Sequence, residues 1–251
     1  MSETTTVVPS PPRGIPVATG AGLTHRGRVR SRNEDAILTD PSGLLWAVAD
    51  GMGGHGNGDV AADIVIDHLG AVPDDTQPGP ALAAAIAAAN AAVLSHAAEH
   101  GKGTMGATVV AVMIVRALAH VAWVGDSRAY LMRAGRLRQL TRDHTFVQAL
   151  IDAGQITEEQ AGTHPESHIV TRAVGGGPEI EIDSLTVPVF PGDRLLLCSD
   201  GLPRCVYDST IEQLLQRAAD PDEACRLLLT EALENGAPDN VSAIVVDIRE
   251  A

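Results

Sequence analysis

Five acidic residues in this sequence stand where an apolar run meets a turn, and they are Asp35, Asp50, Asp126, Asp200 and Asp239. A carboxylate at the end of an apolar strand is partly removed from water, which costs free energy unless an opposite charge is close by. The neighbouring sequence holds too few basic residues to neutralise all five. Hard divalent cations would neutralise them, and a purely oxygen ligand set favours Mg²⁺ or Mn²⁺ over Zn²⁺. The spacing alone leaves two interpretations open, a shared metal site or scattered turn residues.

Asp50 has the most informative surroundings, because the apolar run 44–49 leads straight into it and a glycine-rich segment follows. This arrangement predicts a strand that ends at a rigidly held carboxylate, beside bare backbone that a ligand or metal ion approaches closely. Gly51, Gly53 and Gly56 also match the fingerprint of a dinucleotide-binding loop. Asp50 would repel the pyrophosphate of such a ligand unless a metal intervened, so this alternative is disfavoured.

Composition limits the classes of protein to consider. The chain has 251 residues and a net charge of −14, which opposes a broad nucleic-acid-binding surface. Only 2% of the residues are aromatic, so the core must be aliphatic. The longest apolar run, 105–115, falls short of the ~20 residues of a membrane-spanning helix. Three cysteines without a C-x-x-C pair indicate a reduced, cytoplasmic protein.

Apolar periodicity and turn residues predict the strands and helices. Residues 1–18 are rich in proline and predict a flexible tail, followed by a single domain over 19–251. The expected strands cover 35–40, 44–49, 106–115, 118–125, 128–134, 180–189, 194–199 and 242–248. The expected helices cover 57–70, 80–100, 145–153, 157–162, 208–218 and 221–235. Short turns between strands favour antiparallel hairpins, and segregated helix pairs favour an α+β layered fold.

Seven short motifs follow one another along residues 22–248. They are Arg30-Ser31-Arg32-Asn33-Glu34-Asp35, Asp50-Gly51-Met52-Gly53-Gly54-His55, Gly103-Thr104-Met105-Gly106-Ala107-Thr108, Gly125-Asp126-Ser127-Arg128, Asp143-His144-Thr145-Phe146, Leu197-Cys198-Ser199-Asp200-Gly201-Leu202 and Pro238-Asp239-Asn240-Val241-Ser242. Each one alone is weak, but the order of all seven is specific. In them the chain resembles the metal-dependent protein Ser/Thr phosphatases, the PPM or type 2C family, in its compact bacterial form.

The resemblance implies a four-layer α-β-β-α sandwich, in which two antiparallel sheets are flanked by helix pairs, with a flap insertion over about 144–172. It also implies two core Mn²⁺ or Mg²⁺ ions and the third ion of bacterial members. Asp50 would bridge the two core ions, and Gly51 would lend its carbonyl oxygen to one of them. Asp200 and Asp239 would complete the other.

The resemblance assigns roles to the remaining charged residues as well. Glu34 and Asp35 would act mainly through metal-bound waters, and Asp126 would hold the third ion together with Asp200. Arg30 matches the phosphate-binding arginine of the family, and its planar guanidinium suits two phosphate oxygens.

Two positions depart from the pattern of many relatives. Eukaryotic members carry a histidine after the Asp-Gly pair, which is proposed to protonate the leaving group, whereas this chain has Met52 there, as in bacterial members. His55 is the nearest candidate for that proton and is expected to act as the acid or to contact substrate. The second departure is the segment 202–205, where many relatives have a polar or acidic stretch. It leaves Asp200 in place but alters the rim of the site.

The function that the resemblance implies is hydrolysis of phosphoserine and phosphothreonine in proteins by a metal-activated water. The expected partners are phosphorylated proteins and the bacterial Ser/Thr kinases that the enzyme opposes, and the chain is expected to be a monomer. The alternative is a non-catalytic phosphoprotein-binding or regulatory module on the same fold. Loss of the metal acids would support that alternative, but Asp50, Asp200 and Asp239 are all present.

Overall fold

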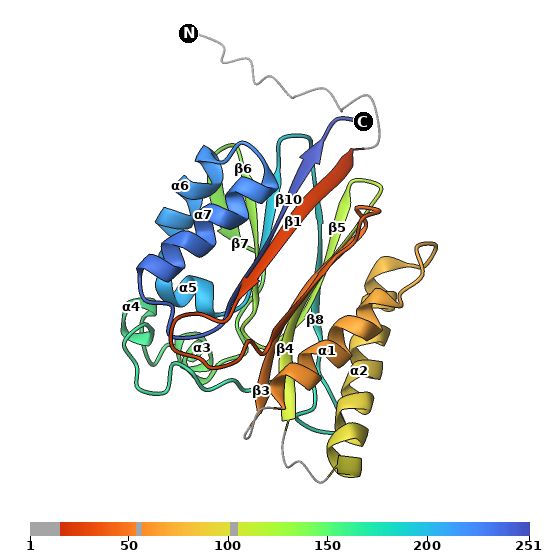
Figure 1. Ribbon diagram of the computed structural model, residues 1–251, viewed down its shortest axis with the longest axis vertical. Coiled ribbons are helices and arrows are strands. Elements are labelled where there is room, and N and C mark those ends of the chain that lie inside the picture. The colour runs from red at the N-terminus through yellow and green to blue at the C-terminus, as the bar shows by residue number, and fades with distance from the viewer. Residues whose placement is uncertain (1–15, 54–56, 101–104) are drawn as a thin grey trace.

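The computed structural model describes residues 16–53, 57–100 and 105–251. Two five-stranded antiparallel sheets face each other, and helices cover their outer faces (Figure 1). One sheet has the order β1 (Val17–His25), β10 (Val241–Arg249), β9 (Arg194–Cys198), β6 (Arg128–Arg133), β7 (Arg136–Gln139). The other has the order β2 (Asp35–Thr39), β3 (Leu45–Gly53), β4 (Met105–Val115), β5 (Leu118–Val124), β8 (Asp183–Pro188). The predicted α+β sandwich with two antiparallel sheets is confirmed.

The helices are segregated by sheet. The pair α1 (Gly58–Gly70) and α2 (Pro78–His100) packs on β3 and β4. The other outer layer consists of α5 (Gly201–Cys205), α6 (Asp208–Arg217) and α7 (Pro221–Glu234), and α7 packs on β1 and β10. Two short helices, α3 (Phe146–Asp152) and α4 (Glu158–Ala161), lie in the segment between β7 and β8.

Central strands such as β4 and β9 are almost entirely apolar because both of their faces are buried. Trp46 and Val48 of β3 point into the space between the sheets, whereas Ala47 and Ala49 point toward the helices. The inter-sheet core takes side chains from both sheets, among them Val110, Val112, Leu195, Leu197, Ile244 and Val246. The acids that follow these strands are therefore held by a rigid, fully packed frame.

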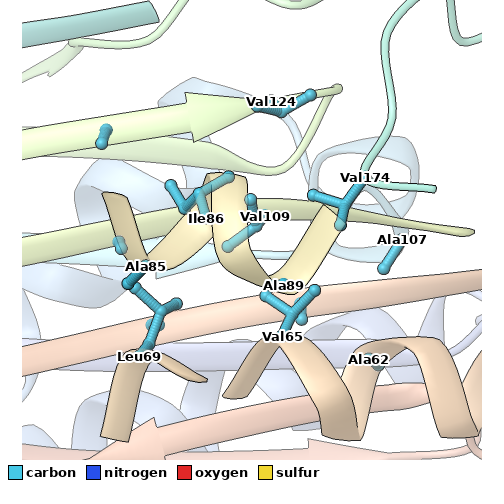
Figure 2. Packing of buried hydrophobic residues seen from close by; sticks show 14 of the residues in the cluster. Ala62, Val65, Leu69, Ala85, Ile86, Ala89, Ala107, Val109, Val124 and Val174 are labelled. Carbon is cyan, nitrogen blue, oxygen red and sulfur yellow. The ribbon is translucent and has the colours of Figure 1, made fainter. Parts of the chain in front are cut away.

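Aliphatic side chains fill the layer between α1, α2 and their sheet (Figure 2). Leu69 of α1 lies beside Ala85 of α2, and Val65 lies beside Ala89, while Ile86 lies near Val109 of β4. By length and apolar composition, α2 is the one helix among the described residues that could also cross a membrane. Core helices of soluble proteins meet the same criterion, and here α2 contacts both α1 and β4.

The sequence prediction missed β1, whose residues include Gly20 and Gly22 and lack an apolar run. These glycines allow the first strand to approach the opposite sheet. A Cβ atom on Gly20 would lie 2.7 Å from Nε1 of Trp46, and one on Gly22 would lie 2.9 Å from Cγ2 of Thr39. The strand begins at Val17, so two residues assigned to the tail pair with β10 instead. The short elements β7 and α5 were not predicted either.

The strand before the glycine-rich segment is longer than predicted. We expected it to end at Asp50, but β3 continues to Gly53, and its last residues pair with Gly106 and Met105 of β4. Glycine weakens a strand on average, yet here the ladder to β4 and the close approach of neighbouring backbone hold it. Asp50 therefore lies inside a strand rather than at its end.

Candidate metal and phosphate site

A cavity of about 340 Å³ opens where the two sheets meet, and it collects most of the predicted site residues. Its charged lining residues are Arg30, Glu34, Asp50, Asp126, Asp200, Arg204 and Asp239. Asp50 lies in β3 and Arg204 in α5, and the other charged residues lie in loops next to strands of both sheets. Five acids and two arginines therefore face one small space, which leaves a surplus of negative charge to be neutralised.

Asp35 lies directly opposite Asp50 in the antiparallel ladder of β2 and β3. Its Oδ2 accepts hydrogen bonds from the hydroxyls of Ser242 at 2.6 Å and Ser199 at 2.8 Å, whereas its buried Oδ1 has no partner. Burial, opposed by the two hydroxyls and reinforced by the charges of nearby acids, raises the pKa of Asp35 to about 7. Asp35 does not line the cavity but stands behind it, 8% exposed.

The acids that line the cavity have raised pKa values for the same reasons. Burial first, and then the charges of Asp35, Asp200 and other acids, raise the pKa of Asp50 well above its ordinary value. Burial and the charge of Asp200 raise the pKa of Asp126 to about 7. Burial also raises the pKa of Asp200, although Arg204 and a hydrogen bond with Asp50 lower it. Without bound metal, carboxyl groups of the site therefore retain protons at neutral pH.

The donor set fits hard divalent cations. The candidate donors are carboxylate oxygens and one backbone carbonyl, which are the oxygen donors that Mg²⁺ and Mn²⁺ prefer. Buried Oδ1 atoms of Asp35 and Asp200 accept no hydrogen bond from a donor group. Such orphaned oxygens cost free energy that a bound cation would recover.

Gly51 and Gly58 bring bare backbone together at the start of α1. A Cβ atom on Gly51 would collide with the carbonyl of Gly58, and one on Gly58 would lie 2.7 Å from the carbonyl carbon of Gly51. Glu34 closes this corner, since its carbonyl accepts from the Gly51 N–H at 3.0 Å and its Oε1 accepts from the Gly58 N–H at 3.3 Å. Only glycine fits at both positions, which leaves the Gly51 backbone accessible from the cavity.

Asn240 ties the last strand to the loop that carries Arg30 and Glu34. Its Oδ1 accepts from the Glu34 N–H at 2.8 Å, and its Nδ2 donates to the carbonyls of Arg26 at 3.0 Å and Arg32 at 2.8 Å. A buried amide with three backbone partners fixes the position of this loop relative to Asp239. The sequence prediction included Asn240 in a motif but gave it no role.

The turn that carries Asp126 is fixed from two sides. Gly125 has a φ of +105°, and a Cβ atom there would collide with the side chain of Thr108. The buried His144 accepts the Gly125 N–H on Nδ1 at 3.1 Å, which leaves its ring proton on Nε2, facing Asp183 at 3.3 Å. Burial lowers the pKa of His144, so this imidazole stays neutral and acts as a support.

Two arginines hold acids of the site. Arg30 donates from Nη2 to Oδ2 of Asp239 at 2.8 Å, while half of its side chain remains exposed at the mouth. Arg204 places Nη2 2.6 Å from Oδ2 of Asp200 and Nη1 3.8 Å from Oδ2 of Asp239. Within the described ranges, no three acidic, histidine or cysteine side chains are arranged so that they could hold a cation. Both arginines contribute to this, because each occupies an oxygen that a cation would need.

The structure thus brings Arg30, Glu34, Gly51 and the four aspartates of the lining together, with Asp35 behind them. His55 lies outside the described residues. Met52 lines the cavity, and so does His168 from the segment 144–172 that was predicted as a flap. Residues that the prediction gave no role are Ser199, Ser242, Asn240, Arg204 and His168. Most of them carry a hydroxyl, amide or cationic side chain close in sequence to a predicted acid. Their contacts with the acids become evident only when the strands are paired.

A larger hollow of about 630 Å³ lies elsewhere, between β6, β9 and the end of β10. Its charged residues are already matched, since Arg194 pairs with Asp247 at 2.6 Å and Asp193 accepts from Arg133 at 2.7 Å. Size alone would favour this hollow, but the surplus of acids marks the smaller cavity as the place for chemistry.

Comparison with known proteins agrees with this choice. The family model for protein phosphatase 2C matches residues 19–235. The serine/threonine protein phosphatase PstP of Mycobacterium tuberculosis is 41% identical over 232 residues, which cover 91% of this chain but only 44% of PstP. The serine/threonine phosphatase Stp of Listeria monocytogenes is 35% identical over 235 residues, covering 89% of this chain and 93% of Stp.

Solved structures give the same result. The crystal structure of the Mycobacterium tuberculosis phosphatase PstP superposes with a TM-score of 0.88 at 40% identity, covering 93% of this chain and all of that one. The catalytic domain of PstP in complex with two manganese ions superposes with a TM-score of 0.86 at 38% identity, covering 94% of this chain.

Proposed function

The chain belongs to the protein phosphatase 2C family, and we propose that it hydrolyses phosphoserine and phosphothreonine in proteins with the help of divalent cations. The observation that supports this most directly is the cavity itself, where Asp50 of β3 and acids from the loops next to strands of both sheets converge beside an exposed arginine. Bound Mn²⁺ or Mg²⁺ would activate a water molecule and stabilise the charge that develops on the phosphoryl group. Neither a cysteine nor a serine nucleophile is needed for that chemistry.

The proposed ligands follow the positions of the residues. Asp50 faces the cavity from the middle of its ladder and is proposed to bridge two ions, with the Gly51 carbonyl on one of them and Asp200 and Asp239 on the other. Asp126 and Asp200 are the proposed ligands of a third ion. Asp35 stands behind the lining with two serine hydroxyls on Oδ2, which suits the indirect role that we propose for it.

Glu34 shares that indirect role, and Arg30 is proposed to orient the substrate. The Arg30 guanidinium is exposed at the mouth of the cavity and close to Asp239, whose hydrogen bond raises the pKa of Arg30 and keeps it charged. A phosphate monoester that enters the mouth meets this planar cation first. Orientation of the phosphoryl group toward the acids reduces the entropy cost of the reaction.

Protonation of the leaving serine or threonine oxygen needs a separate group. Met52 lines the cavity but carries no proton to donate. His55 remains the candidate proposed from the sequence, and His168 is a histidine within the described part of the chain that lines the cavity. The roles of His55 and His168 are distinguished by comparing a substrate whose leaving group needs a proton with one whose leaving group does not.

The proposed substrates are phosphorylated proteins, and the proposed functional partners are the Ser/Thr kinases that produce them. We further propose that the domain over residues 19–251 acts as a monomer in the cytoplasm. A non-catalytic module is the weaker candidate, because the acids proposed to bind metal are all present and face one cavity.

Hydrolysis of p-nitrophenyl phosphate and of a phosphothreonine peptide with Mn²⁺ tests the proposal. We expect metal-dependent turnover that falls to background in Asp50→Ala and Asp239→Ala. Asp63→Ala is the matched control, because Asp63 is an exposed acid on α1 whose neighbours Asp67 and Asp59 are also acidic. Wild-type protein without metal-dependent turnover would favour the non-catalytic module. Variants that retain turnover would contradict the roles proposed for Asp50 and Asp239.

A further inference from the structure

Arg204 occupies an unusual position, because the short helix α5 places it directly over the acid that precedes the helix. The Arg204 N–H donates to the carbonyl of Asp200 at 3.1 Å, so the two residues are one helical turn apart. Residues spaced by four on a helix lie on the same face. The guanidinium therefore extends back over the Asp200 carboxylate and into the cavity.

The positive charge of Arg204 acts on three acids of the site. Nη2 lies 2.6 Å from Oδ2 of Asp200, and Nη1 lies 3.8 Å from Oδ2 of Asp239, which also accepts from Arg30. The charge of Arg204 also lowers the pKa of Asp126 against the effect of burial. These three acids are among those proposed above to bind cations.

We propose that Arg204 is a displaceable counter-ion, which neutralises Asp200 and Asp239 in the metal-free protein and must leave them before the cations bind. This inference rests on the proposed metal site, but concerns a residue with no place in that site. A cation and a guanidinium compete for the same oxygen of Asp200.

The surroundings of Arg204 favour displacement. Its side chain is 37% exposed, so the guanidinium regains water when it leaves. Arg194 shows the contrast, because its guanidinium makes two hydrogen bonds to Asp247 and two more to backbone carbonyls, and its side chain is only 12% exposed. Such a pair is costly to separate, whereas a partly exposed pair contributes little free energy.

Competition of this kind has two opposite consequences. Without metal, Arg204 offsets part of the repulsion among the acids and so stabilises the fold. During metal binding, the free energy of the broken ion pair is subtracted from the binding free energy, which weakens the apparent affinity. Removal of the charge should therefore strengthen metal binding and destabilise the metal-free protein.

The test is calorimetric titration of metal-free full-length chain with Mn²⁺, in wild type, Arg204→Gln and the control Arg136→Gln. Arg136 is an exposed arginine whose loss changes the net charge equally, and it lies 4.0 Å from Glu212, away from the cavity. We expect Arg204→Gln to bind Mn²⁺ about fivefold more tightly, the factor given by an ion pair near the upper end of the range for exposed pairs. We expect the same variant to melt at a lower temperature without metal, and the control to match wild type in both measurements.

Unchanged or weaker Mn²⁺ binding by Arg204→Gln, beside normal binding by wild type, overturns the inference and leaves the proposed function intact. Wild type that binds no Mn²⁺ overturns both. If the variant does not fold without metal, competition with a chelator on the loaded proteins gives the same ratio of affinities. Arg204→Lys keeps a charge but not the planar fork, and its affinity should fall between the two.

Discussion

Asp35 and Asp50 are a directly opposed pair of carboxylates on the antiparallel strands β2 and β3. Like charges at opposed positions destabilise a sheet, so this pair needs a compensating interaction. Two serine hydroxyls supply part of it at Asp35, whereas the charges of Asp35 and Asp200 act on the buried Asp50 and raise its pKa. Asp50, the residue proposed to bridge two cations, is therefore surrounded by repelling acids in the metal-free site.

Metal binding is expected to raise the melting temperature of the chain. A ligand at 100 times its Kd stabilises the folded state by about 2.7 kcal/mol, which corresponds to roughly 5–10 °C for a domain of this size. Thermal unfolding followed by circular dichroism, with EDTA and with Mn²⁺, measures the shift. Asp50→Ala should lose most of it, and identical curves for the wild type would contradict a metal site.

The stability of the metal-free protein is expected to fall as the pH rises from about 5 to about 7.5. Asp35 and Asp126 have pKa values of about 7 in the folded protein, against an ordinary value of 3.8. The folded state therefore retains protons that the unfolded chain has released, so its advantage is present at low pH and is lost as the pH passes through 7. Melting temperatures of metal-free protein across this range give the slope.

Asp126→Asn provides the control for that slope. The variant removes one of the two titrating groups and its repulsion of Asp200, so its metal-free form should be more stable at neutral pH and its slope shallower. A stability that rises with pH over the same range in the wild type would show that these carboxyls are not protonated.

Asn240→Ala is expected to destabilise the fold by about 3 kcal/mol, because it leaves buried backbone groups of the 26–34 loop without partners. Urea unfolding measures the loss, and Mn²⁺ titration should show weaker binding because Glu34 is no longer fixed. Asn235→Ala is the matched control, since the Asn235 amide is exposed at the end of α7. Equal effects of the two substitutions would argue against a positioning role.

The source of the leaving-group proton is tested by comparing two substrates. p-Nitrophenolate leaves without a proton, whereas the threonine oxygen of a phosphopeptide must gain one. If His168 donates it, His168→Ala should lower kcat for the peptide about 100-fold and barely change kcat for p-nitrophenyl phosphate.

His55→Ala and His164→Ala complete that comparison. His164 lies in the same segment as His168, but its ring lies 6.3 Å from that of Phe146 and it does not line the cavity. A selective loss in His55→Ala would assign the proton to the residue proposed from the sequence. Equal losses on both substrates in His168→Ala would exclude acid catalysis by that residue.

Gly20→Ala is expected to cost about 1–3 kcal/mol, because the added Cβ would lie 2.7 Å from Trp46 and 3.0 Å from the Val245 carbonyl. Gly79→Ala is the control, since no atom lies within 4 Å of a Cβ atom there. Urea unfolding of both variants measures the difference. A harmless Gly20→Ala would show that the two sheets are free to move apart at β1.

The order of strands and helices along the chain predicted an α+β layered fold, and the family resemblance added the two-sheet sandwich and the roles of the acids that line the cavity. Long apolar strands such as β4 have strong local signals, and the acids after them fall where loops begin. β1 has no such local signal. Its glycines are required by close contacts with the opposite sheet, whose strands lie further along the chain. The continuation of β3 beyond Asp50 likewise depends on pairing with β4 rather than on local propensity.

The partners of the acids were beyond prediction for a similar reason. Ser199 and Ser242 contact Asp35 only because β9 and β10 are neighbours in one sheet and β2 packs across from them. The contact between Arg204 and Asp200 was within reach, because it depends only on four-residue spacing in a helix. It was missed because no helix was predicted over 201–205.

The two hydroxyl partners of Asp35 lie 164 and 207 positions further along the chain. A ribosome delivers the amino-terminal part of a chain first and at a limited rate, so the acid leaves the exit tunnel long before the serines do. Contacts between such distant positions also form slowly after release. The hydrogen bonds that hold Asp35 therefore cannot form until both β9 and β10 have been synthesised.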